Sequence, residues 1–266
     1  MKKRGKHRGF PGRYKIGRRF GKNENIMKYS KVSIGRFLER PNRFIARVEL
    51  DGEMLVCHVK NTGRCRELLI PGAQVALAKA ENPARKTAYD LIAAYKGRWI
   101  NMDSQAPNQV FAEWARKAGF PPGLTELRPE VKWGASRFDF AFSAGNRRGL
   151  IEIKGVTLEE NAVARFPDAP TQRGARHLRE LAQAAAAGLE TWAVFVVQMA
   201  GMRYVTPNRQ TDPDFARALE EAAAAGVRIL ALECRVAPDT LEITGEIPVQ
   251  IYEGASESWD GRNIRK

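Results

Sequence analysis

Two acidic side chains and a lysine lie close together in the middle of the chain, at a spacing that suits chemistry on phosphates. In the run LIEIK, a strand alternates its side chains between faces, so Glu152 and Lys154 share one face, with Cα atoms roughly 7 Å apart. Asp139 precedes them in the run RFDF, and pairing of strands 137–142 and 150–155 would place it beside Glu152. Neighbouring carboxylates repel each other unless a cation lies between them, and oxygen ligands favour Mg²⁺ or Mn²⁺.

Asp139 and Glu152 are therefore candidate metal ligands, and Lys154 is a candidate for orienting a metal-bound water or stabilising charge on a phosphate. Glu130, on the strand before, is a candidate further acid, and Glu113 on a preceding helix could complete the shell. The alternative is an ordinary half-exposed strand, in which charged and apolar residues also alternate. Glu-x-Lys is a common tripeptide, and this chain holds a second copy that begins at Glu130. The spacing alone leaves both interpretations open.

The elements around these residues predict an α/β (α+β) domain with a mixed sheet over residues 96–250. In chain order we expect a helix at 107–119, strands at 127–133, 137–142 and 150–155, a helix at 171–187, a strand at 191–198, a helix at 212–225 and strands at 227–234 and 241–246. The core order of helix, three strands, helix and strand is that of restriction-endonuclease-like nucleases with the PD-(D/E)xK signature. This order of elements supports the metal-site interpretation more than the Glu-x-Lys tripeptide does by itself.

The first half of the chain predicts a small OB-like β-barrel over residues 30–95. Short strand-like runs separated by turn signals are typical of such barrels. The expected strands, which begin near residue 33, include 43–50, 53–60, 73–80 and 86–94. Small barrels of this type often bind oligonucleotides, but the fold can also be a packing platform.

The net charge of +14 points to nucleic acid, although its distribution weakens that argument. Residues 1–26 hold ten Lys/Arg and one acid, a net +9, which leaves 34 bases and 29 acids, or +5, for the rest. We expect residues 1–29 to form a basic, disordered extension and residues 251–266 a C-terminal tail. The extension is either a phosphate-binding arm or an upstream stretch translated from a misassigned start, with Met27 the true first residue.

Other features exclude several classes of protein. No apolar run approaches the roughly 20 residues that cross a bilayer, and the charged N-terminus is unlike a secretory signal. The chain has three scattered cysteines, which give neither a disulfide framework nor a zinc spacing, and three histidines far apart in sequence. We therefore expect a cytoplasmic protein without a membrane partner. The composition leaves a homo-oligomer open.

Long motifs in a fixed order resemble the sugar fermentation stimulation protein (SfsA) family over about residues 30–250. They are RFLERPNRF (36–44), HVKNTGRCRELLIPG (58–72), RPEVKWGASRFDF (128–140), IEIKGVTL (151–158), FPDAPTQRGARHLREL (166–181) and FVVQ (195–198). The resemblance implies a DNA-binding protein linked to regulation of sugar, notably maltose, fermentation. It also implies an OB-like barrel followed by a nuclease-like domain with a divalent-metal site. By motif, Asp139, Glu152 and Lys154 match the nuclease signature, with Glu130 as a further acid, whereas Cys65 stands where the family often has methionine.

Basic residues suggest where nucleic acid binds. On the barrel we expect Arg43, Lys60 and Arg64 to grip the strand, and Arg173 and Arg176 begin a basic stripe on the 171–187 helix, followed by Arg179 three residues on. A solvated helix face is the more common explanation of such a stripe. Thr171 could cap the helix, whose free N–H groups could hold a phosphate, but a plain helix-entry loop is the alternative. The leading hypothesis is a Mg²⁺- or Mn²⁺-dependent nuclease acting on DNA. A non-enzymatic DNA-binding transcriptional regulator and an RNA-directed nuclease are its alternatives.

Overall fold

The structure is a computed structural model that describes residues 26–61 and 63–252. Most of the basic extension and of the C-terminal tail thus lies outside the described residues. Within them, no helix is long and apolar enough to cross a membrane.

The first domain is the expected OB-type barrel, and the structure confirms this prediction. Its strands are β2 (Val32–Asn42), β3 (Ile45–Leu50), β4 (Glu53–Val59), β5 (Gln74–Lys79), β6 (Tyr89–Tyr95) and β7 (Trp99–Asn101). The strand order is β4-β3-β2-β5-β6-β7, and pairing of β4 with β6 closes five strands into a barrel. Side chains alternate along β3, so Ala46 and Val48 are fully buried inside the barrel while Arg47 and Glu49 face outward. The barrel sheet runs past the predicted boundary at 95 to include β7.

The second domain is the expected mixed sheet. Its main elements are β1 (Met27–Lys28), α1 (Ala106–Ala118), β8 (Leu124–Trp133), β9 (Ser136–Ala144), β10 (Arg147–Val156), α2 (Gln172–Ala186), β13 (Glu190–Val197), α3 (Pro213–Ala224), β15 (Arg228–Ala237) and β16 (Thr240–Glu246). The sheet order is β1-β16-β15-β13-β10-β9-β8, with β10, β13 and β15 parallel and the other pairs antiparallel. A small second sheet adds β11 (Leu158–Glu160), β12 (Val163–Phe166) and β14 (Tyr204–Pro207).

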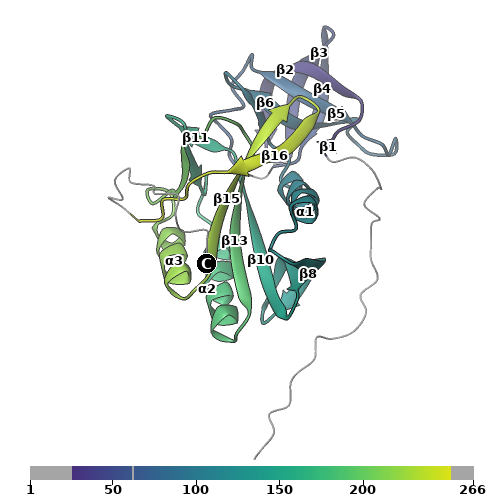
Figure 1. The fold of residues 1–266 in the computed structure, drawn as a ribbon. Coiled ribbons are helices and arrows are strands. Elements are labelled where there is room, and N and C mark those ends of the chain that lie inside the picture. The colour runs from purple at the N-terminus through teal and green to yellow at the C-terminus, as the bar shows by residue number, and fades with distance from the viewer. Residues whose placement is uncertain (1–25, 62, 253–266) are drawn as a thin grey trace, which may run out of the picture.

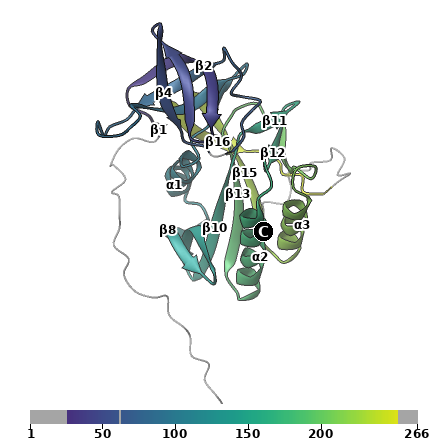
Figure 2. The ribbon, with the colours of Figure 1, turned by 180° about the vertical axis from the view of Figure 1, so that it is seen from behind.

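Helices cover both faces of the seven-stranded sheet, as Figures 1 and 2 show from opposite sides. On one face, α1 packs through Phe111 against Phe140 and the odd-numbered residues of β10. On the other face, α2 contributes Leu178 and Leu181 to a core that continues into the barrel interior. The two domains therefore share one hydrophobic cluster, and the strands between the helix layers are buried on both faces.

The helices begin and end where the sequence indicates. Thr171 accepts a hydrogen bond from Gly174 N at 3.0 Å and so caps α2, and Asp212 caps α3 through Phe215 N at 2.9 Å. Asp212 also accepts from Thr171 N at 2.7 Å, which ties the two helix starts together. Gly119 ends α1 in the left-handed conformation (φ 65°) that favours glycine.

The N-terminal end of the described chain belongs to the second domain. Met27 and Lys28 form β1, which pairs with β16 at the edge of the large sheet. Tyr29 then donates a hydrogen bond to Asp103 at 3.2 Å. Residues 27–29 were predicted to belong to a disordered extension, and this part of the prediction is wrong, since they add a strand to the sheet.

Candidate active site

Asp139 lies where strands β9 and β10 separate. Their ladder ends at the pair Ile151–Phe140, while β9 continues to pair with β8. The half-buried Asp139 carboxylate fills the resulting gap, and its Oδ2 accepts a hydrogen bond from Ile153 N at 2.7 Å. Its Oδ1 accepts from Asn108 Nδ2, on the first turn of α1, at 2.8 Å. Both oxygens are thereby fixed beside β10.

Glu152 and Lys154 occupy the face of β10 that is turned towards α2. The ammonium of Lys154 lies 2.7 Å from Glu152 Oε1, and His177 Nδ1 of α2 lies 2.5 Å from the same oxygen. All three side chains are nearly inaccessible, with exposed fractions of 11% for Lys154, 5% for Glu152 and 2% for His177. Glu152 Oε2 is buried and has no hydrogen-bond partner. A buried carboxylate oxygen without a partner is costly in a protein interior.

The two acids have opposite electrostatic surroundings. Burial raises the pKa of Asp139, and the neighbouring carboxylate of Glu152 raises it further. Burial also opposes ionisation of Glu152, but Lys154 and His177 outweigh it, so the pKa of Glu152 lies below its ordinary value. Divergent pKa values in two adjacent acids are typical of functional sites, although structural ion pairs produce them too.

The acid pair fits a hard divalent cation. Asp139 and Glu152 could hold it between them, because a cation would satisfy Glu152 Oε2 and offset the repulsion that raises the pKa of Asp139. Among the described residues, no group of three or more His, Cys, Asp or Glu side chains could hold a metal. The remaining positions would thus fall to water and substrate phosphate, as is usual for Mg²⁺, which protein carboxylates seldom enclose completely.

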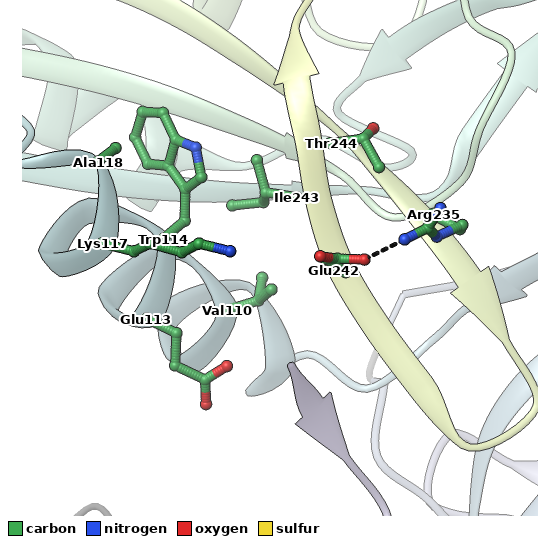
Figure 3. Close-up of a pocket in the computed structure, with 9 residues that line it drawn as sticks. All are labelled: Val110, Glu113, Trp114, Lys117, Ala118, Arg235, Glu242, Ile243 and Thr244. Atoms are coloured by element: carbon green, nitrogen blue, oxygen red, sulfur yellow. Dashed lines mark hydrogen bonds and ion pairs between the residues drawn. The ribbon is translucent and has the colours of Figure 1, made fainter. Parts of the chain in front are cut away.

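Glu130 and Glu113 do not join the acid pair. Glu130 has a left-handed backbone (φ 53°) that turns its side chain outward, where it is 75% exposed and 3.5 Å from Arg137 Nη1. Glu113 accepts a hydrogen bond from Gln109 and lines a groove of about 530 Å³ between α1 and the β15–β16 hairpin (Figure 3). Both acids were predicted as further members of the shell, and the structure places them elsewhere.

The predicted nucleic-acid-binding residues of the barrel differ in their exposure and in their contacts. Arg43 is exposed and lies over the ring of Phe44, with 4.7 Å between the guanidinium carbon and the ring centroid. Arg64 is also exposed. The ammonium of Lys60 is instead 2.6 Å from Asp103 Oδ2, and its side chain is only 23% exposed.

On α2, Arg173 contacts His177, the residue that lies against Glu152. It is exposed, and its Nε donates to His177 Nε2 at 3.4 Å. Arg176 lies 3.9 Å from Glu180. Arg179 forms ion pairs with Asp214 of α3. The stripe is therefore partly neutralised along α2, and its positive end lies beside the acid site.

Sequence reasoning missed His177 and Asn108, the two side chains that hold the acids. His177 had a signal, because it lies on the apolar face of α2 with Gly174, Leu178 and Leu181. A lone histidine on such a face does not reveal its partner. Asn108 had no signal beyond its place in the first turn of a helix.

The fold and the site together define a class: a five-stranded OB barrel followed by a restriction-endonuclease-like domain with acids at the edge where β9 leaves β10. Residues 38–102 match the SfsA N-terminal OB domain, and residues 105–240 match the sugar fermentation stimulation protein RE domain. The chain belongs to the sugar fermentation stimulation protein (SfsA) family.

Individual relatives agree with this assignment. The chain is 55% identical to the sugar fermentation stimulation protein homolog of Desulfitobacterium hafniense strain Y51, over 86% of this chain and 100% of the relative. It is 49% identical to the homolog of Ruminiclostridium cellulolyticum, over 85% of this chain and 100% of that protein. Among solved structures, Pyrococcus furiosus SfsA in complex with Ca²⁺ is 28% identical, with a TM-score of 0.78 and coverage of 86% of this chain and 100% of that one.

Proposed function

We propose that this protein binds DNA and cuts it at a divalent-metal site of the PD-(D/E)xK type. The observation that carries the proposal is the arrangement of Asp139 beside a buried Glu152 whose Oε1 is held by Lys154 and His177. Asp139 corresponds to the D of the signature, and Glu152 and Lys154 correspond to its (D/E)xK part. The Pyrococcus furiosus relative was solved in complex with Ca²⁺, which supports a cation site in the family.

Each residue has a chemical task in this proposal. Asp139 and Glu152 hold the cation, and Mg²⁺ or Mn²⁺, when bound, supplies Lewis-acid activation and lowers the pKa of a coordinated water. Lys154 lies within reach of Glu152 Oε1 at 2.7 Å, so its ammonium can orient the attacking water or stabilise charge on the phosphate. Asn108 and His177 keep the two acids oriented, as outer partners of metal ligands commonly do.

The basic residues would hold the nucleic acid across the site. Arg173 begins α2 next to His177, and Arg176 follows one turn later. Arg43, with Phe44 44% exposed beneath it, offers a cation and an aromatic ring on the barrel, a combination that suits a stacked base and its phosphate. Arg64 adds a further exposed cation. The three cysteines are free and buried, which fits the reducing cytoplasm where we place the protein.

The test is cleavage of end-labelled single- and double-stranded DNA and RNA, with Mn²⁺ or with EDTA. We expect Mn²⁺-dependent cleavage of DNA by the wild type and none by Glu152→Gln, while Glu126→Gln, an exposed acid on β8, retains activity. Binding without cutting in every condition would replace the nuclease by a DNA-binding transcriptional regulator on the same fold. Cleavage confined to RNA would assign an RNA-directed nuclease.

A further inference from the structure

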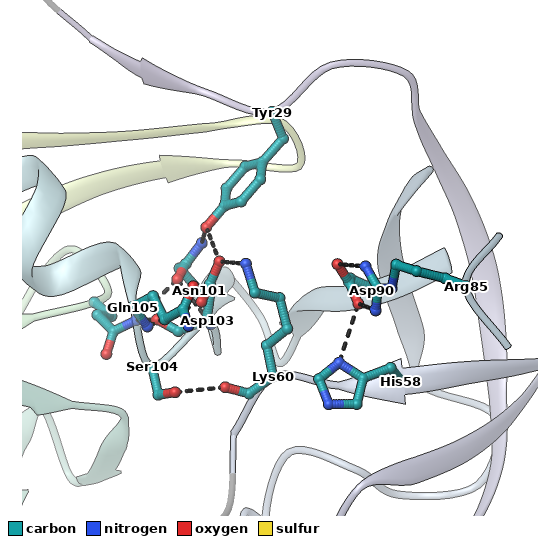
Figure 4. Close-up of polar contacts among 10 residues, drawn as sticks. Tyr29, His58, Lys60, Arg85, Asp90, Asn101, Asp103, Ser104 and Gln105 are labelled. Carbon is teal, nitrogen blue, oxygen red and sulfur yellow. Dashed lines mark hydrogen bonds and ion pairs between the residues drawn. The ribbon is translucent and has the colours of Figure 1, made fainter. Parts of the chain in front are cut away.

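Four residues of the barrel, Lys60, Asn61, Gly63 and Arg64, form a short segment that touches the second domain. At its first end, Lys60 Nζ lies 2.6 Å from Asp103 Oδ2, and Asp103 is 99% buried. Lys60 O accepts hydrogen bonds from Ser104 Oγ at 2.6 Å and from Ser104 N at 3.1 Å (Figure 4). This end of the segment is therefore held by its side chain and by its backbone.

The other end of the segment is attached to the loop before α2. Arg64 N donates to Asp168 Oδ2 at 3.1 Å, and a Cβ at Gly63 would overlap the same oxygen. Arg40 of β2 fixes the shape of this end, because its guanidinium donates to Gly63 O and Arg64 O, each at 2.8 Å, and to Asn61 O at 2.6 Å. A side chain at position 63 would displace the Asp168 carboxylate from this contact.

Asp103 and Asp168, which contact the segment, precede α1 and α2 in the chain. These are the helices whose Asn108 and His177 contact Asp139 and Glu152. Asp103 accepts from Gln105 N at 2.9 Å and so fixes the start of α1, whose Asn108 donates to Asp139. Asp168 precedes α2, whose His177 contacts Glu152. The barrel segment thus contacts the residues that lead into each of these two helices.

A buried polar network continues from Asp103 to β10. Gln198 donates through Nε2 to Asn101 Oδ1 at 2.8 Å and to Asp103 O at 3.1 Å, and its N donates to Val156 O at 2.9 Å. Gly155 follows Lys154, and a Cβ there would lie 2.6 Å from Gln198 Oε1. The strand that carries Glu152 and Lys154 is thereby packed against the same network.

We propose that this segment forms a positioning clamp through which the barrel sets the geometry of the metal site, with Lys60 and Asp103 as positioning residues. The inference rests on the proposed function and changes the role of Lys60, which we had expected to bind phosphate. Its ammonium compensates a buried carboxylate, and removing it would leave Asp103 at the start of α1 without a cation, held only by the neutral donors Tyr29 and Gln105 N. Displacement of α1 would then carry Asn108 away from Asp139.

The test compares Lys60→Met with Lys60→Arg and with Lys79→Met, a control at an exposed lysine of β5. We measure Mn²⁺ affinity by calorimetry without nucleic acid, and the affinity of a labelled DNA oligonucleotide in EDTA over a range of salt. We expect Lys60→Met to weaken Mn²⁺ binding about 10- to 100-fold, as loss of outer partners of metal ligands usually does. DNA affinity and its salt slope should stay as in the wild type, and Lys60→Arg should recover most of the Mn²⁺ affinity.

The opposite pattern overturns the proposal. If Lys60 contacts phosphate, Lys60→Met lowers the salt slope by about 0.9 and leaves Mn²⁺ affinity unchanged. If Lys60→Met does not fold, Lys60→Gln removes the charge but keeps a polar side chain, and wild-type Mn²⁺ affinity in that protein refutes the clamp.

A second measurement tests the clamp independently of the proposed function. If the wild type binds no Mn²⁺, the proposed metal site fails, and amide hydrogen exchange decides on the clamp alone. Faster exchange over residues 104–110 and 150–156 in Lys60→Met than in Lys79→Met supports it, and equal exchange overturns it.

Discussion

Replacing Lys154 by methionine tests the electrostatic account of the acid site most sharply. The change keeps the length of the side chain and removes the ammonium that lies 2.7 Å from Glu152 Oε1, where the two side chains are 11% and 5% exposed. The Glu152 carboxylate then stays buried near Asp139 with only His177 on Oε1. Breaking a buried pair from one side costs about 3–5 kcal/mol, and because His177 remains we expect a loss of about 3 kcal/mol in the free energy of unfolding at pH 8 in EDTA.

The effect should depend on pH in a defined direction. Burial disfavours ionised Glu152, but Lys154 and His177 hold its pKa below the ordinary 4.5, so the pair stabilises the wild type above about pH 4.5 and loses this as pH falls through the lowered pKa. In Lys154→Met the pKa of Glu152 should rise, because the ammonium that most strongly opposes the effect of burial is gone. The variant then gains stability as pH falls through that raised pKa. The difference between the two proteins is therefore largest at pH 8 and shrinks towards pH 4.5.

The assay is urea unfolding followed by far-ultraviolet circular dichroism at both pH values. Lys154→Met combined with Glu152→Gln should regain about 2 kcal/mol over Lys154→Met, because no buried carboxylate is left without its cation. Lys132→Met is the matched control, an exposed lysine in the second Glu-x-Lys, and should stay within about 0.5 kcal/mol of the wild type. A wild-type value for Lys154→Met at pH 8, or an equal loss at both pH values, would refute the reasoning.

Three further variants address the surroundings of the site. His177→Ala removes the contact to Glu152 at 2.5 Å and should weaken Mn²⁺ affinity about 10- to 100-fold by calorimetry, with His177→Gln less affected. Arg173→Ala should lower the slope of log K for DNA against log salt by about 0.9, and an unchanged slope would remove Arg173 from the binding surface. Gly155→Ala places a Cβ 2.6 Å from Gln198 Oε1 and should cost about 1–3 kcal/mol in urea unfolding, whereas a neutral change would mean that this packing is loose.

Local patterns in the sequence predicted most of the fold that carries the site. The expected hairpin of β9 and β10 brought Asp139 to β10, where it accepts from Ile153 N, and alternation placed Glu152 and Lys154 on one face. The helices α1, α2 and α3 were recognisable from their caps and glycines. These features depend on residues close in sequence, so one amino-acid sequence is enough to predict them.

Features that depend on docking were not predictable. His177 meets Glu152 only after α2 packs on the sheet, and Lys60 meets Asp103 only after the barrel packs on the second domain. The error at Glu130 has a local cause, because its left-handed backbone breaks the alternation from which its side-chain direction was inferred. The short strands β1, β7, β11, β12 and β14 have too few residues for a recognisable period.

The central claim is that Asp139 and Glu152 hold one divalent cation, and calorimetric titration of the metal-stripped protein with Mn²⁺ tests it most directly. The geometry predicts one bound Mn²⁺ per chain in the wild type, and binding lost or weakened at least 100-fold in both Asp139→Asn and Glu152→Gln. Glu130→Gln, whose carboxylate is 75% exposed, should bind as the wild type does. Absence of binding in the wild type, or wild-type affinity in both Asp139→Asn and Glu152→Gln, would contradict the account.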